Sequence, residues 1–402
     1  MLRKIVKNTH EIAATAADFF AFRYPGYVYG LKLPYGSIPV FCFHGVELNS
    51  LDAMLEYLDY NGYTTLDADE YHDIVTRKSA PPRKAVVLTF DDGWGSLWTI
   101  GFPLIKKWGA KIIVFIPPGR IELAGKVGHN LDDLKAGKCA REEVFDRDRS
   151  SMPLLTWEET TVMHESGLVD FQSHSYNHGL ITRSNRIVSF LDPSLVSGTG
   201  MMELPCPPVT RPIGARAPAR LGEPLYETAP RLSDIPRLIV DPLVANGCVQ
   251  FVEEYGGKQF FERENWRHEL AQLAKALLRK CGSIGNESQT EQIEAIRFEL
   301  AASKRAIEDM LPGKTVRHIC YPWHVAGRIT QNEVKAVGYK SAFWGKIDER
   351  YSNPIPADPF KIARMGGDFF YRLPGKGRSS LFRILAGKMI RRACQGSPYL
   401  TH

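Results

Sequence analysis

The sequence predicts an α/β fold in which parallel strands form an open sheet or a closed barrel. Short apolar runs rich in β-branched residues alternate with segments of helical periodicity, which is typical of βαβ units. Glycines follow several helical segments just before the next apolar run, as helix C-caps do: Gly62, Gly109, Gly167 and Gly338. The 402 residues, 44% of them hydrophobic, supply ample material for a sizeable core.

The individual elements follow from these patterns. The expected strands are Ile38–Phe43, Ala85–Phe90, Lys111–Ile116, Leu168–Gln172 and Val316–Tyr321, with further candidates at Lys340–Trp344 and Phe360–Arg364. The expected helices are Ser50–Asn61, Thr99–Trp108, Thr156–Ser166 and Glu291–Leu311. Apolar residues at helical spacing from Trp266 to Leu278 predict one more helix.

The segment Pro193–Pro242 interrupts this alternation, with ten prolines in fifty residues. Such a segment holds neither long helices nor central strands, yet it is too apolar for a solvated linker. We therefore expect an ordered, loop-rich insertion that wraps a surface. The predicted organisation is a first part of a barrel at 1–182, a Pro-rich and helical insertion at 183–285, and the remainder of the barrel at 286–402.

Two carboxylates, Asp91 and Asp92, stand at the end of the strand Ala85–Phe90 and precede Gly93. Adjacent carboxylates at a strand end can point in different directions, so that one binds a metal while the other takes a proton from water. Glycine lets the chain turn sharply beside them. Taken alone, the same residues also fit a plain strand end followed by an Asp-Gly turn.

Two histidines, His174 and His178, follow another predicted strand at a spacing of four. Such a pair can share one metal ion on one face of a helical turn, and a carboxylate from Asp92 completes a His₂Asp set with an open position. An isolated pair is more often two surface histidines. Both signals fall at strand ends of one α/β pattern, where the active sites of such sheets gather, and this favours a site.

The motifs TFDDG (Thr89–Gly93) and HSYNH (His174–His178) together resemble the first two motifs of the polysaccharide deacetylase family, also called NodB-homology or carbohydrate esterase family 4. The similarity covers roughly Pro39–Gln172, His174–Thr182 and Glu291–Arg364. It implies a distorted (β/α) barrel that removes N- or O-acyl groups from sugars. It also implies Asp91 as general base, with Asp92, His174 and His178 as ligands of one divalent metal, for which Zn²⁺ is expected.

The third family motif is similar to Cys320-Tyr321-Pro322-Trp323, and it implies the backbone N–H of Trp323 as an oxyanion donor. The sequence departs from the family here. Many members carry an arginine two residues before this proline, which tethers the catalytic aspartate, and this chain has Cys320. Arg364, at the end of a late predicted strand, is a candidate substitute, although a surface cation is the other interpretation.

The sequence also departs from the family pattern at the general acid, because no late Leu-x-His motif follows Trp323. His44, at the end of the first strand, is similar to the early motif of the circularly permuted subset of the family, and this implies His44 as the acid. A capping or supporting histidine is the alternative, and His324 is the rival acid. The remaining internal histidines are expected to be solvated: His72, His129, His164, His268 and His318.

The resemblance implies a metal-dependent hydrolase that removes an N-acetyl or other short acyl group from an amino sugar of a glycan or glycan precursor. The alternative is an O-acyl esterase or a deformylase acting on a lipid-linked sugar. A glycan-binding barrel without activity predicts loss of a metal ligand, and the Asp-His-His set is complete. The expected partner is a saccharide or glycolipid substrate. A nucleic acid is not expected, because the basic tail is short and apolar.

Composition sets the remaining expectations. Seven dispersed cysteines argue against a disulfide framework, and the first residues show no secretory signal, so a cytoplasmic protein is predicted. The segment Ser379–Arg392 could form a basic amphipathic helix, either packed on the barrel or lying at the inner membrane surface. After Asp368 the chain has no acidic residue, and its basic residues there are Arg372, Lys376, Arg378, Arg383, Lys388, Arg391 and Arg392.

Overall fold

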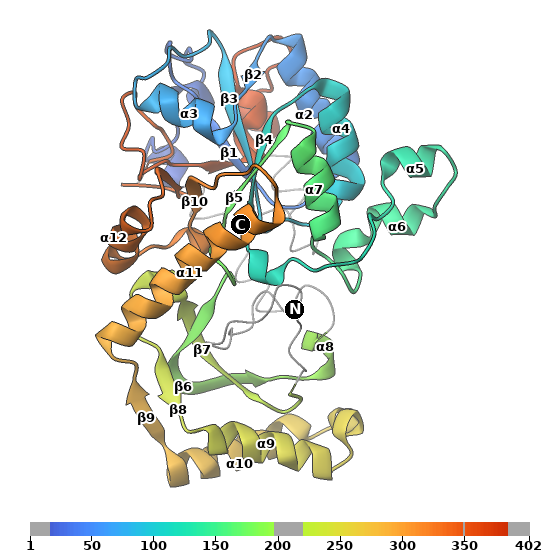
Figure 1. Cartoon of the computed structure of the whole chain (residues 1–402), viewed down its shortest axis with the longest axis vertical. Coiled ribbons are helices and arrows are strands. Elements are labelled where there is room, and N and C mark those ends of the chain that lie inside the picture. Colours follow the sequence, from blue (N-terminus) through green and yellow to red (C-terminus); the bar gives the residue numbers. More distant parts are fainter. Residues whose placement is uncertain (1–16, 197–219, 349, 385–402) are drawn as a thin grey trace.

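A parallel sheet forms the centre of the fold (Figure 1), and the computed structural model describes residues 17–196, 220–348 and 350–384. Neighbouring strands follow the order β11-β10-β5-β4-β3-β1-β12, with β2 beside β3, and every pairing is parallel. The strands are β1 Val40–Phe43, β2 Thr64–Thr65, β3 Ala85–Asp91, β4 Ile112–Ile116, β5 Val169–Ser173, β10 His318–Cys320, β11 Ser341–Phe343 and β12 Met365–Gly366. The predicted α/β class is confirmed.

The two ends of the sheet are joined by one short segment. Ile362 bridges to Phe343 of β11, and Met365 pairs with Phe41 of β1, so the strands curve into a distorted barrel. The predicted strand Phe360–Arg364 is therefore misplaced, because only its Ile362 forms a bridge. The reason is an Asx turn: the side chain of Asp358 accepts from the Phe360 N–H, which keeps that residue out of the ladder.

Helices cover the outside of the barrel (Figure 1). They are α2 Leu48–Tyr60, α3 Ala68–Val75, α4 Phe102–Trp108, α7 Trp157–Glu165, α11 Gln289–Met310 and α12 Arg328–Ala336. A π-helical turn, η2 Leu97–Gly101, precedes α4, so the predicted helix Thr99–Trp108 is regular only in its second part. The predicted C-cap glycines are confirmed, with φ of 65° at Gly62, 61° at Gly109, 70° at Gly167 and 90° at Gly338.

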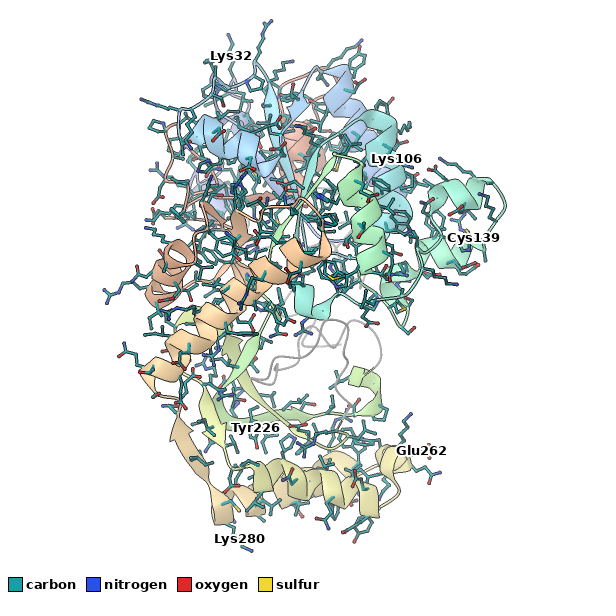
Figure 2. The ribbon with its side chains drawn as sticks, viewed as in Figure 1. Lys32, Lys106, Cys139, Tyr226, Glu262 and Lys280 are labelled. Carbon is teal, nitrogen blue, oxygen red and sulfur yellow. The ribbon has the colours of Figure 1, made fainter. Side chains whose placement is uncertain are left out.

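An excursion between β4 and α7 projects from the barrel, as Figure 2 shows around Cys139. It contains η3 Pro118–Arg120, α5 Leu131–Lys135, α6 Arg141–Phe145 and η4 Arg147–Arg149. Its last residues return to the loop that follows the paired carboxylates. The Leu155 N–H donates to the carbonyl of Gly93, and the Gly95 N–H donates to the carbonyl of Pro153, both at 2.8 Å. This excursion was not predicted from the sequence.

The insertion lobe, residues 180–286, forms the lower part of the molecule (Figure 2, around Tyr226 and Lys280). Its elements are β6 Leu180–Phe190, α8 Pro193–Val196, β7 Pro224–Pro230, η6 Arg231–Ser233, β8 Leu238–Val240, α9 Pro242–Glu254, η7 Gly257–Glu262, α10 Trp266–Cys281 and β9 Ser283–Asn286. Strands β6 and β7 form one antiparallel pair, and β8 and β9 form another. α9 and α10 share with β6 a separate apolar core that includes Phe190, Cys248 and Leu270.

The expectation of a loop-rich insertion is wrong for its described part. β7 lies inside the Pro-rich segment, and its prolines are tolerated because Pro224 and Pro230 stand at the ends of a two-stranded ribbon, where a missing N–H costs little. The predicted boundary at 182/183 falls within β6. Residues 197–219, the middle of the Pro-rich segment, lie outside the described part of the chain.

Two expectations about other regions need comment. His72 and His318 are not solvated, because each packs between α3 and the amino end of β10 and is 6% or less exposed. Of the predicted basic helix Ser379–Arg392, residues 381–384 are helical and the rest lies outside the described residues. Among the helices within the described ranges, none is both long and apolar enough to cross a bilayer.

Candidate metal centre

The predicted site residues follow the carboxyl ends of neighbouring strands. Asp92 follows β3, His174 follows β5, and Trp323 follows β10 after one short turn, η8 Pro322–His324. Since β3 and β10 flank β4 and β5 in the sheet, these loops meet at one edge. Non-glycine residues with positive φ gather here, a strain of about 1–3 kcal/mol each that persists only where the surroundings impose it. They are Asp92 (69°), Ser175 (59°), His178 (52°), Trp323 (58°) and His324 (56°).

Three ligand atoms converge on one point. Oδ1 of Asp92 lies 3.4 Å from Nε2 of His178 and 3.5 Å from Nε2 of His174. All three residues are buried, and Oδ1 of Asp92 has no hydrogen-bond partner among the described residues. Such an orphaned buried carboxylate oxygen is costly unless something else binds it. Two imidazoles and one carboxylate match a catalytic zinc site, which keeps a position open for water or substrate.

Neighbouring groups orient two of these ligands. Nδ1 of His174 lies 2.8 Å from the carbonyl of Cys320, so this nitrogen is the N–H donor and Nε2 carries the lone pair. The Trp94 indole N–H donates to Oδ2 of Asp92 at 3.3 Å, which leaves Oδ1 for the ion. Burial lowers the pKa of His178 to about 3, so its imidazole stays neutral. Burial acts to raise the pKa of Asp92, but the net shift is downward, so this carboxyl stays ionised beside the histidines.

Asp91, the adjacent carboxylate, is fully paired. Arg364 donates from Nη1 to Oδ1 and from Nη2 to Oδ2, both at 2.7 Å, and the two side chains are buried. Arg364 also donates to Thr89 and to the carbonyl of Trp344. Burial acts to raise the pKa of Asp91, but the charge and hydrogen bonds of Arg364, with smaller contributions from neighbouring histidines, outweigh it and lower the pKa well below its usual range. Arg364 thus contacts the aspartate that the arginine missing at Cys320 would tether.

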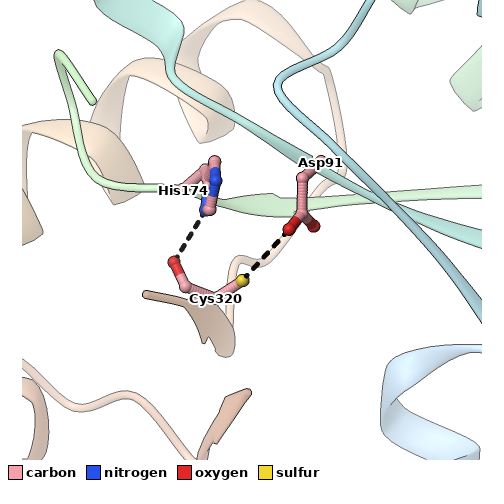
Figure 3. A group of neighbouring side chains, drawn as sticks. All are labelled: Asp91, His174 and Cys320. Carbon is pink, nitrogen blue, oxygen red and sulfur yellow. Dashed lines mark hydrogen bonds between the residues drawn. The ribbon is translucent and has the colours of Figure 1, made fainter. Parts of the chain in front are cut away.

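A second group with ligand-type atoms, shown in Figure 3, comprises Asp91, His174 and Cys320. Its atoms are already engaged. Asp91 holds Arg364, the His174 Nδ1 faces the Cys320 carbonyl, and the Cys320 sulfur lies 2.8 Å from Nη2 of Arg364. Burial raises the pKa of Cys320 well above its ordinary value, so its sulfur is a thiol, whereas metals bind the thiolate. The Asp92 group is therefore the better candidate.

Both candidate acids lie near the site. His44 is half-buried directly after β1, and it interacts electrostatically with Asp91, Asp92 and His324. His324 has its Nδ1 3.5 Å from Nη2 of Arg364. Burial, followed by the Arg364 charge, lowers the pKa of His324 to about 3, so this imidazole is neutral and a poor proton donor. His44 therefore stays the predicted acid.

Trp323 stands beside the metal ligands. Its ring centroid lies 4.9 Å from that of His178, and its backbone has a positive φ of 58°. An N–H donor at this place suits an oxyanion, because the strained turn is fixed before any substrate binds.

Sequence reasoning missed several residues that hold the site together. Trp94 orients Asp92, and Glu299 on α11 binds the loop between the two histidines. Only Glu299 left a signal, because it is an acid directly beside Leu300 on the apolar face of a predicted helix. Arg231 of the insertion lobe donates from its N–H to the Gly179 carbonyl at 2.9 Å, next to His178. The contacts of Glu299 and Arg231 join residues far apart in the chain, and no local pattern encodes them.

The fold and the site define an α/β barrel with a buried His₂Asp group at the carboxyl ends of its strands. Residues 78–188 match the model of the family described as polysaccharide deacetylase. This match includes Asp91, Asp92, His174 and His178, whereas His44, Trp323 and Arg364 lie outside it. The predicted resemblance is confirmed, because this part of the chain is similar to the polysaccharide deacetylases.

Three comparisons show the extent of the similarity. The chain is 32% identical over 87 residues to the Bacillus subtilis (strain 168) protein YxkH, covering 20% of this chain and 31% of that protein. It is 29% identical over 153 residues to the poly-beta-1,6-N-acetyl-D-glucosamine N-deacetylase of Escherichia coli (strain K12), covering 37% of this chain and 20% of that enzyme. A solved de-N-acetylase from Aggregatibacter actinomycetemcomitans aligns over 88% of this chain and 99% of its own, with 16% identity and a TM-score of 0.49. The matched segments thus span less than a third of these two curated relatives.

Proposed function

We propose that this protein is a metal-dependent hydrolase that removes an N-acetyl or other short acyl group from an amino sugar of a glycan or glycan precursor. The observation that carries the proposal is the convergence of Asp92, His174 and His178 on one point, with the Asp92 oxygen unpaired. The name of the Escherichia coli relative supports the same chemistry. Zn²⁺ is the ion that two imidazoles and one carboxylate suit best.

Asp91 and His44 divide the proton transfers between them in this proposal. The bound metal ion would polarise the acyl carbonyl and acidify a water molecule. Asp91 takes one proton from the attacking water, whose oxygen bonds to the carbonyl carbon. Arg364 fixes the orientation of Asp91 and leaves further lone pairs on the carboxylate to accept that proton.

The second half of the reaction uses the other side of the site. The backbone N–H of Trp323 donates to the oxyanion, which forms only in the transition state and the intermediate. His44, as imidazolium, gives its proton to the leaving nitrogen while the C–N bond breaks. The products are a free amino sugar and a short carboxylic acid.

The experiment combines metal analysis with product detection. Purified protein is stripped with a chelator, reloaded with Zn²⁺ and incubated with acetylated amino-sugar oligomers, and products are measured by mass spectrometry. We expect one equivalent of metal, acetate release that requires it, and no turnover by an Asp91→Asn variant of unchanged metal content. Full activity after exhaustive chelation would contradict the proposal. Release from ester substrates alone, or of formate, would favour the O-acyl esterase or the deformylase of a lipid-linked sugar.

We propose, in addition, that the insertion lobe forms a wall beside the active-site mouth. β6 begins two residues after His178, and the Leu232 carbonyl accepts from the Gly327 N–H at 2.7 Å, so the lobe contacts the loops of two motifs. Val240 and Ser283 are paired neighbours, so a short turn can replace residues 241–282. Hydrolysis of a small acetyl sugar should survive this change, and hydrolysis of long oligomers should fall. Equal losses on both would mean that the lobe only supports the fold.

The cellular setting remains part of the proposal. A cytoplasmic protein with a peripheral contact at the inner membrane surface would meet a lipid-linked glycan precursor, and the basic segment after Asp368 suits anionic lipid. Sedimentation with anionic and neutral vesicles tests this contact. Equal binding to both kinds of vesicle, or to neither, would remove it from the proposal.

A further inference from the structure

The loop between the two candidate ligand histidines is held by a buried carboxylate on α11. Oε2 of Glu299 accepts from the backbone N–H of Asn177 at 2.9 Å, and Oε1 accepts from the Asn177 side-chain amide at 2.8 Å. Asn177 directly precedes His178. One side chain thus fixes both the backbone and the side chain of the residue next to a ligand.

Other elements hold the same loop at neighbouring peptides. The Gly119 N–H donates to the carbonyl of Tyr176 at 2.8 Å, and Nε of Arg120 donates to the carbonyl of Asn177. The hydroxyls of Ser173 and Ser303 lie 2.8 Å apart, which ties the beginning of the loop to α11 as well. Glu299 is the only acid among these groups.

The carboxylate of Glu299 is buried, which costs hydration free energy. The residue is 7% exposed, and it forms no ion pair with any residue in the described ranges. A buried carboxylate without a cation lowers stability unless strong hydrogen bonds offset its desolvation. Both of its oxygens accept hydrogen bonds from Asn177, which presents two donors. The charge is therefore placed where the shape of the His178 turn depends on it.

We propose that Glu299 is a positioning residue for the metal centre. It holds Asn177, so that His178 keeps its strained turn with φ of 52° and Nε2 stays directed at the Asp92 oxygen. The inference rests on the proposed metal-dependent function, but it concerns the affinity for the ion rather than the reaction. Partners of this kind typically change metal affinity by about 10–100-fold when removed.

The matched substitutions are Glu299→Gln and Glu294→Gln. Glutamine keeps the shape of Glu299, but its NH₂ group faces one of the two Asn177 donors, so one hydrogen bond is lost. Glu294 lies on the same helix and is exposed, so its substitution makes the same change of charge without touching the loop. Asn177→Ala removes the side-chain amide bond from the other side and leaves the backbone N–H of residue 177 to donate to Oε2 of Glu299.

The measurement is zinc affinity, by competition with a chromophoric chelator, together with the melting temperature of the metal-free proteins. We expect the zinc Kd of Glu299→Gln to rise about 10–100-fold and that of Glu294→Gln to stay within about twofold of wild type. The double variant Glu299→Gln/Asn177→Ala should bind no more weakly than Asn177→Ala alone, because both remove one interaction.

An unchanged zinc Kd in Glu299→Gln, or additive losses in the double variant, overturns the inference. A lower melting temperature with wild-type affinity does so as well, since it shows a merely structural role. If Glu299→Gln does not fold, Asn177→Ala is held to the same criterion. A wild-type protein that binds no zinc contradicts the proposed function itself, so the two failures are distinguishable.

Discussion

Two clusters of histidine and carboxylate lie at opposite ends of strand β10. At its amino end, Nδ1 of His318 is 2.6 Å from the Ser341 hydroxyl, and Nε2 is 3.1 Å from Oδ1 of Asp69. Arg317 donates to Oδ2 of the same aspartate at 2.7 Å. At its carboxyl end, Asp92, His174 and His178 converge without a bond between their facing atoms.

The difference separates a structural cluster from a binding site. The chain Asp69–His318–Ser341 has the composition of a nucleophilic triad, but Ser341 is wholly buried and no substrate could reach it. Its polar atoms are satisfied by one another, as buried polar groups in a stable core are. In the Asp92 cluster, by contrast, the facing Oδ1 of Asp92 has no hydrogen-bond partner among the described residues.

The same contrast recurs between adjacent residues. Asp91 has both oxygens bound by Arg364, whereas Asp92 has one oxygen on Trp94 and the other unpaired. Composition alone does not distinguish the two carboxylates. Their partners do, because Arg364 holds Asp91 in place, whereas Oδ1 of Asp92 is left as a candidate metal ligand.

The largest effect should come from exchanging a residue in each cluster. His178→Ala removes a ligand, so we expect metal content and turnover to fall to background. His318→Gln should keep full metal content and lose about 1–3 kcal/mol of stability, because a buried hydrogen-bonded group is disrupted. Metal analysis and urea unfolding measure the two quantities. Equal loss of metal in both variants would contradict the claim that only the Asp92 cluster binds an ion.

A smaller loss, measured here as stability, should follow the removal of Arg364. Arg364→Met leaves the buried Asp91 without its cation, and breaking one partner of such a pair costs about 3–5 kcal/mol. The double variant Asp91→Asn/Arg364→Met should recover part of that loss, since no buried charge is left alone. Denaturant unfolding of the metal-free proteins tests both. A loss below about 1 kcal/mol in the single variant would mean that the pair is solvated.

The smallest effect is a pH dependence of the structural cluster. The hydrogen bond and charge of His318, with Arg317, outweigh burial and lower the pKa of Asp69 below its ordinary value. Stability from this group is therefore present above that value and lost as the pH falls through the lower folded pKa. Because Asp69 is about half exposed, we expect no more than about 1 kcal/mol between wild type and Asp69→Asn. The gap should close in acid, and a gap that widens would contradict the assignment.

Local sequence patterns predicted much of the fold and several residues of the candidate site. The β-branched runs located the parallel strands, the glycines marked the helix ends, and the spacing of the motifs brought Asp91, Asp92, His174 and His178 to one edge. Arg364 was a candidate only because the family resemblance implies an arginine beside the catalytic aspartate, and Cys320 stands at the usual position of that arginine. The burial of His318, the role of Glu299 and the strands of the insertion lobe depend on partners far along the chain. Periodicity and spacing do not report such contacts.

The central claim is that Asp92, His174 and His178 hold one divalent ion. The most direct measurement is an anomalous difference map from a zinc-soaked crystal, with data collected on both sides of the zinc absorption edge. We predict one strong peak between Oδ1 of Asp92 and the two Nε2 atoms, lost in a crystal of the His178→Ala variant. No peak, or a peak between Asp91 and Cys320, would contradict the account.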